Sequence, residues 1–89
     1  SGGVESECGA VEIENGKTME LSLKENTMNN NIVIEVLDES GKGIVKEEIK
    51  ANNLEMIRIN DNLKEGKYKL FIQFKKNTIG TLELNWNEK

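Results

Sequence analysis

Apolar and polar residues alternate along most of the chain, in short runs that predict β-strands. The clearest run places Tyr68, Leu70, Ile72 and Phe74 at every second position, and only Phe71 interrupts the polar residues between them. A period of two puts successive side chains on opposite faces of a strand. Similar runs occur over residues 11–13, 19–23, 32–37, 44–49, 54–59 and 80–86. Short strands at this regular spacing predict an all-β fold, a seven-stranded antiparallel β-sandwich.

The positions of the apolar residues limit how neighbouring strands can pair. Directly opposed residues of an antiparallel pair lie on the same face, so apolar residues have to oppose apolar ones. A three-residue loop over 14–16 satisfies this rule by pairing Val11 with Met19, and the alternative is that these two strands lie in different sheets. At the other end of the chain, a loop over 77–79 pairs Phe74 with Leu82, Ile72 with Leu84 and Leu70 with Trp86. We therefore expect a closing hairpin, with Trp86 facing inward.

The connection before the sixth predicted strand carries the strongest topological signal. Leu63 is followed by Gly66 and then by Tyr68 at the start of the strand. This spacing resembles the tyrosine corner of immunoglobulin-like sandwiches, in which the tyrosine hydroxyl bonds back to upstream backbone. The alternative is an ordinary glycine turn followed by a half-buried tyrosine. The corner predicts that the sandwich is immunoglobulin-like.

Residues 34–85 also resemble the turn pattern of small immunoglobulin-like accessory domains in secreted bacterial proteins, such as secretion-tail domains. A strand ends at Asp38, Gly41 and Lys42 follow, and the Leu63–Tyr68 corner leads into the last strands. The resemblance implies an extracytoplasmic location, secreted or anchored at the cell surface. The acidic, aromatic strand that ends at Trp86 differs from the basic, aliphatic end of a secretion tail, so a sorting signal is not expected.

The first nine residues are expected to be a flexible lead-in to a single domain over residues 10–89. Ser1, Gly2 and Gly3 resemble the segment that follows the lipidated cysteine of bacterial lipoproteins, which implies a lipid anchor upstream of Ser1. A tag remnant is the alternative. No apolar run reaches the roughly 18 residues of a transmembrane helix, so no transmembrane segment is expected.

Composition argues against catalysis. The 89 residues include no histidine and no proline, and Cys8 is the single cysteine. A chain without histidine cannot form a Ser-His-Asp triad, a Cys-His pair or a histidine-ligated metal site. Cys8 has no internal disulfide partner and no basic residue close by in sequence to activate it. We expect no catalytic residues and no cofactor.

Acidic residues are the remaining candidates for chemistry. Glu12, Glu14, Glu47, Glu48 and Glu83 are expected at solvent-facing strand positions, where a small sandwich leaves little room for a cleft. The oxygen-rich loops 38–41 and 60–62, with Glu65 nearby, contain calcium-type ligands without regular spacing. Polar residues that cap turns explain these loops as well, so no metal site is predicted.

Charge is divided unevenly between the two halves of the chain. The net charge is −4, but residues 1–48 carry −7 and residues 49–89 carry +3. Lys67, Lys69 and Lys75 share the outward face of the sixth strand with Phe71, and these four residues are the candidate partner site. A solvated strand face is the alternative. With one arginine in the chain and Phe71 alone between the lysines, nucleic-acid binding is not expected.

These observations predict a non-catalytic interaction or accessory module that binds a protein or a cell-envelope partner. The alternative is a small secreted immunoglobulin-like protease inhibitor that acts through end loops, here residues 24–31 and 60–67.

Overall fold

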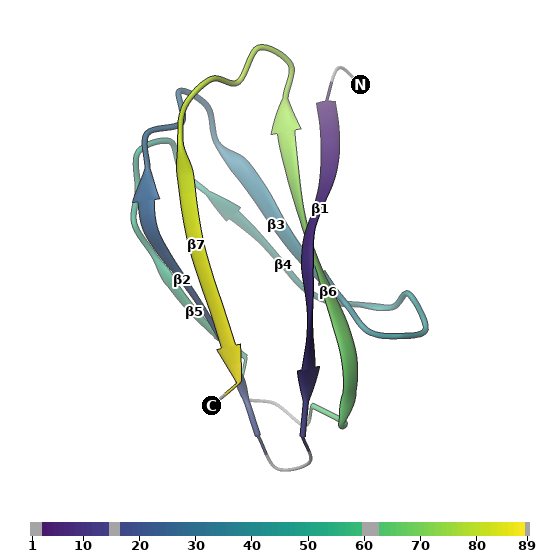
Figure 1. The fold of residues 1–89 in the computed structure, drawn as a ribbon. Helices are drawn as coiled ribbons and strands as arrows, with labels where there is room; N and C mark the ends of the chain where they lie inside the picture. Colours follow the sequence, from purple (N-terminus) through teal and green to yellow (C-terminus); the bar gives the residue numbers. More distant parts are fainter. Residues whose placement is uncertain (1–2, 15–16, 60–62, 89) are drawn as a thin grey trace.

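A computed structural model describes residues 3–14, 17–59 and 63–88, which form seven strands in two antiparallel sheets (Figure 1). The strands are β1 (Gly3–Ile13), β2 (Met19–Asn26), β3 (Ile32–Leu37), β4 (Gly43–Ile49), β5 (Met56–Ile59), β6 (Gly66–Lys75) and β7 (Leu82–Glu88). The four-stranded sheet has the order β1-β6-β3-β4 and the three-stranded sheet the order β5-β2-β7. The predicted all-β, two-sheet architecture is therefore confirmed.

The core lies between the two sheets and consists of the apolar residues that alternate along each strand. The central strands contribute most of it, because a strand with neighbours on both sides has its inward face fully covered. The side chains of Met19, Leu21, Ile34 and Val36 have no exposed surface, and Leu70 has almost none. Replacing a buried leucine or isoleucine of this kind by alanine typically costs about 2–5 kcal/mol.

Part of the predicted N-terminal lead-in lies in a β-strand. Residues 3–9 were expected in a flexible lead-in, but they form the first part of β1 and pair with β6 from Gly3↔Lys75 onward. β6 is ten residues long and offers a matching edge, so backbone hydrogen bonds suffice to extend β1. A shift of register between Glu7 and Gly9 breaks the alternation and hides this strand from a search for a period of two.

Both predicted hairpins are wrong. β1 pairs with β6 rather than β2, so the alternative of two different sheets holds, and Asn15 and Gly16 lie outside the described residues. β7 pairs with β2, with Trp86 opposite Leu21, and does not pair with β6. The rule that apolar residues oppose apolar residues holds for neighbours within one sheet. It holds equally for residues of two sheets that face each other across the core. Both connections therefore cross between sheets, as Figure 1 shows.

Asparagine side chains tie together the connections at one end of the sandwich. Asn26 is buried; its Nδ2 donates to the carbonyl oxygens of Asn53 (2.8 Å) and Lys50 (3.3 Å), and its Oδ1 accepts from the backbone N–H of Met28 (3.0 Å). The β2–β3 connection is thereby joined to the β4–β5 connection.

The β6–β7 connection is held at the same end. The Oδ1 of Asn29 accepts from the backbone N–H of Ile79 (2.8 Å), and the backbone N–H of Thr27 donates to the carbonyl oxygen of Thr81 (2.9 Å). Gly80 lies between these contacts, with a φ of +146°. The loop 24–31 of the inhibitor hypothesis therefore consists of the end of β2 and a tightly bonded turn.

The second segment of that hypothesis lies at the other end of the sandwich. The β5–β6 connection joins the lower ends of these strands in Figure 1, whereas the β2–β3 connection joins the upper ends of its strands. Residues 60–62 lie outside the described residues. The two loops do not form one surface. Among the described residues, no helix has the length and apolar character needed to cross a membrane.

Candidate functional site

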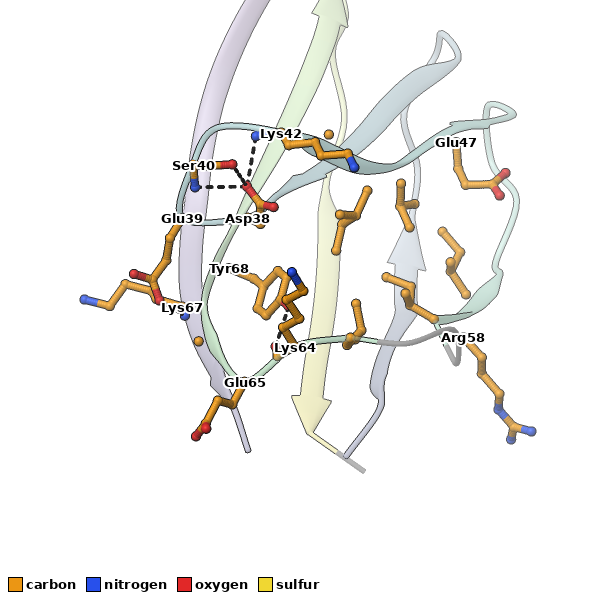
Figure 2. Close-up of a pocket in the computed structure, with 17 residues that line it drawn as sticks. Asp38, Glu39, Ser40, Lys42, Glu47, Arg58, Lys64, Glu65, Lys67 and Tyr68 are labelled. Carbon is orange, nitrogen blue, oxygen red and sulfur yellow. Dashed lines mark hydrogen bonds between the residues drawn. The ribbon is translucent and has the colours of Figure 1, made fainter. Parts of the chain in front are cut away.

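An open groove of about 780 Å³ lies between the two sheets, on the side where β4 and β5 form the edges (Figure 2). β4 lines one wall and β5 the other, while the turn 38–42 and the connection 63–65 close one end. β4 and β5 each have a neighbour on one side only, so both present unpaired backbone groups along the groove. The sequence led us to expect little room for a cleft, and the structure has this open groove between its sheets.

Apolar side chains form the floor of the groove. Ile57, Ile59 and Tyr68 are buried, whereas Ile44, Val45 and Leu63 are half-buried and pack against the core. Side chains that are half-buried beside unpaired strand edges keep part of their apolar surface in contact with water. A partner that covers them would gain the free energy of removing that surface from water.

Tyr68 stands at the end of the groove where β6 begins. Its hydroxyl donates to the carbonyl oxygen of Lys64 at 2.5 Å, which is the bond to upstream backbone that the predicted corner requires. Leu63 packs against the core one residue before Lys64. Burial, with a smaller contribution from the negative charge of Asp38, raises the pKa of Tyr68 above its ordinary value of 10.0.

Replacing Tyr68 by phenylalanine is expected to lower the free energy of unfolding by about 1–2 kcal/mol, because the hydrogen bond to Lys64 is lost. The raised pKa stabilises the fold fully below pH 10, and this contribution is lost as the pH rises through the folded-state pKa. The difference between the two proteins should therefore shrink at high pH. Urea unfolding at neutral and alkaline pH measures both effects. Equal stability at neutral pH would contradict the corner.

Asp38 orders the turn that closes one end of the groove. Its Oδ1 accepts hydrogen bonds from the Ser40 hydroxyl (2.7 Å), the Ser40 backbone N–H (2.9 Å) and the Lys42 backbone N–H (3.0 Å). The oxygen-rich segment 38–41 therefore has a structural use, because one carboxylate oxygen of Asp38 already accepts hydrogen bonds within the turn. In the described part of the chain, no three acidic, cysteine or histidine side chains gather to hold a metal ion.

The hydrogen bonds to Asp38 are expected to change the pKa of its carboxyl group, which can be measured. The hydrogen bond from the Ser40 hydroxyl, followed by that from the Lys42 backbone, lowers the pKa of Asp38 from its ordinary value of 3.8. A lowered pKa means that the turn is stabilised above pH 3.8 and loses this stabilisation as the pH falls through the folded-state value. NMR of the Asp38 side-chain carbonyl should show the low pKa, and Ser40→Ala should raise it. A midpoint at or above 3.8 in the native protein would rule out this role of the turn.

Gly66 lets the same turn approach β6. The Oε1 atom of Glu39 accepts from the Lys67 backbone N–H at 2.7 Å. A Cβ atom at Gly66 would lie 2.7 Å from that oxygen, and Gly66 has a φ of +148°. The backbone conformation therefore favours glycine at the predicted corner, whereas the Glu39 carboxylate is the far end of a flexible side chain that can shift away from an added Cβ atom.

The four candidate partner residues lie on the opposite, outer face of the four-stranded sheet, although Lys67 also lines the edge of the groove. The register puts Lys67 beside Glu12 of β1, and Phe71 beside Glu35 of β3. Phe71 is half-buried, so it is less accessible than expected. Lys69 and Lys75 share this face. The surface is mixed in charge because Glu12 of β1 and Glu35 of β3 share it with the lysines of β6.

Of the glutamates considered for acid–base chemistry, Glu47 lies at the rim of the groove, and Glu12 and Glu14 line a second hollow at the end where β1 and β7 finish. All three are exposed to solvent, as are Glu48 and Glu83. The loop 60–62, one of the calcium candidates, lies outside the described residues.

Glu47 is exposed to solvent as expected, and the strand register adds which face of β4 it belongs to. The register of β4 with β3 places Glu47 opposite the fully buried Ile34, on the same face as Val45 and Ile49. The sequence contains this information, because Val45, Glu47 and Ile49 lie at every second position. The neighbouring Glu48 hides it, since two adjacent glutamates indicate a strand segment that faces solvent. Trp86 faces inward as predicted, half-buried against the core.

Comparisons of the chain with protein-family models, with curated proteins and with solved structures found no match.

Proposed function

We propose that this chain is a non-catalytic, extracytoplasmic interaction module that binds an extended segment of a partner protein in the groove between β4 and β5. The observation that carries the proposal is the combination of an apolar floor with two unpaired strand edges. An extended peptide can add to such an edge through backbone hydrogen bonds while alternate side chains enter the groove. The groove supports this role better than the Phe71 face, where β6 already has neighbours on both sides.

The proposal includes an immunoglobulin-like fold in which the first and last strands have exchanged places. Immunoglobulin sandwiches pair the second strand with the fifth and the third with the sixth. β2 pairs with β5 and β3 with β6 in the same way, whereas β4 pairs with β3 instead of lying beside β5 as the fourth strand does in the constant-type sandwich. β1 lies beside β6 and β7 beside β2, where the immunoglobulin arrangement has its seventh and first strands. The tyrosine corner at Tyr68 supports the same assignment.

Support for the extracytoplasmic location comes from the sequence. The turn pattern over residues 34–85 resembles accessory domains of secreted bacterial proteins.

Selection of random peptides displayed on phage tests the proposed site. Peptides enriched on the native protein are expected to show alternating apolar residues, and Val45→Glu in the groove should abolish their binding. Phe71→Ser is the matched control on the outer face and should leave binding unchanged, with both variants first shown to be folded by thermal melting. Loss of binding in Phe71→Ser alone, or no enrichment of peptides, would contradict the groove as the site.

A further inference from the structure

Glu47 is the charged residue among the inward-facing positions of β4. Val45, Glu47 and Ile49 lie opposite Val36, Ile34 and Ile32, which are all buried. Opposed residues of an antiparallel pair share a face, so Glu47 belongs to the face that looks into the groove. Its carboxylate is exposed at the rim on the β4 side (Figure 2), and within residues 3–14, 17–59 and 63–88 no side chain forms an ion pair with it.

This placement of Glu47 limits which residues an added strand can have beside it at the edge of β4. A strand that adds to β4 brings alternate side chains onto the inward face, beside Val45 and Glu47. An apolar residue beside Glu47 would remove water from the carboxylate without replacing its hydrogen bonds, and an acidic residue would repel it. A lysine or arginine at that position would supply both charge and hydrogen-bond donors.

A hypothetical pairing of β4 with the β4 strand of a second copy illustrates how Glu47 would disfavour an acidic residue opposite it. In the antiparallel register centred on Glu47, Val45 of each strand opposes Ile49 of the other. Lys46 then opposes Glu48 on the outer face, so these pairs are favourable. Only the central pair, Glu47 with Glu47, is repulsive. An inward-pointing charge on an edge strand is a known protection against edge-to-edge association.

In the described residues, the inward positions of the other edge strands contain no lysine or arginine that could face Glu47. The inward positions of β5 are Ile57 and Ile59, and those of β7 are Leu82, Leu84, Trp86 and Glu88. The positions of β1 that oppose inward residues of β6 contain no lysine or arginine either. Lys42 and Lys64 also line the groove, but among the described residues neither forms an ion pair with Glu47, so its carboxylate is left available to a cation of a partner.

We infer that Glu47 selects the partner at the β4 edge: an extended segment of another protein with a lysine or arginine facing Glu47 and an apolar residue two positions away facing Val45. The same carboxylate excludes pairing with a second copy. The inference rests on the proposed function for its partner, whereas the exclusion of self-pairing can be tested with this chain alone.

Sedimentation velocity tests the exclusion. Glu47→Val is expected to form dimers at concentrations where the native protein is monomeric, because valines replace the repulsive central pair. Glu48→Val lies on the outer face of the same strand and should remain monomeric. A native protein that already dimerises through β4, or a Glu47→Val variant that melts normally but stays monomeric, would overturn the inference.

Two synthetic peptides test the selection. Each has about nine residues that alternate valine and threonine, and they differ only in a central valine, replaced by lysine in one and by glutamate in the other. The native protein should bind the lysine peptide about tenfold more tightly, and Glu47→Lys should reverse the preference. Equal binding of the two peptides would overturn the selection but leave the groove as a binding site. Binding of neither peptide to any variant, with Glu47→Val still forming dimers, would count against the proposed function alone.

Discussion

Replacing Gly80 by alanine is expected to lower the free energy of unfolding by about 3 kcal/mol or more. A Cβ atom at this position would lie 2.6 Å from the carbonyl oxygen of Thr27 and 2.7–2.8 Å from backbone atoms of Met28. These are backbone atoms of the β2–β3 connection, held by the asparagine contacts, so they cannot move aside as a side chain would. The φ of +146° adds strain for any residue with a Cβ atom.

Gly9→Ala is the matched control for this prediction. Gly9 has a φ of +147°, but nothing lies within 4 Å of the Cβ position. The control therefore carries the backbone strain alone, and its difference from Gly80→Ala measures the close approach of the two connections. Thermal melting should show a loss of more than about 10 °C for Gly80→Ala and a smaller loss for Gly9→Ala. Equal losses would show that the close packing of the β6–β7 connection is not important for stability.

Asn26→Asp is expected to destabilise the protein by about 3–5 kcal/mol at neutral pH. The substitution keeps the acceptor for the Met28 N–H but places a buried carboxylate 2.8 Å from the carbonyl oxygen of Asn53, where the native amide donates. A protonated carboxyl can donate to that oxygen. The pKa of the introduced group is thus raised in the folded state, so the variant is most stable at low pH and loses stability as the pH rises.

Asn29→Asp provides the comparison for Asn26→Asp. Asn29 lies at the same end of the sandwich and accepts from Ile79, but its side chain is exposed to solvent. The substitution should therefore cost less than about 1 kcal/mol. Urea unfolding between pH 4 and pH 7 measures both variants. A loss for Asn26→Asp that is small and does not change with pH would show that the amide does not join the connections.

The strands could be predicted from the sequence because each is encoded locally. The alternation over Tyr68–Phe74 gives both the strand and the face that is buried, and the seven predicted runs correspond to the seven strands of the described chain. The hydroxyl bond of Tyr68 could also be predicted, because the corner depends on residues only four positions apart. Local spacing determines these features.

Strand pairing could not be predicted in the same way. The rule that apolar residues oppose apolar residues does not distinguish a neighbour in one sheet from a residue across the core. Leu70 and Trp86 satisfy the rule for a hairpin, although β6 and β7 lie in different sheets. The groove was missed for the same reason: it exists because β4 and β5 are both edges, which depends on the pairing. Once β4 is known to be an edge beside β3, the inward position of Glu47 follows from its register with Ile34.

NMR of the isotope-labelled protein, titrated with the lysine peptide, tests most directly whether the groove is the binding site. The backbone amide signals of Val45 and Glu47, and those of β5 across the groove, are expected to show the largest shifts. The signals of Phe71 and its neighbours on the outer face should stay unchanged. Shifts centred on Phe71, or on the edges of β1 and β7, would contradict binding in the groove between β4 and β5.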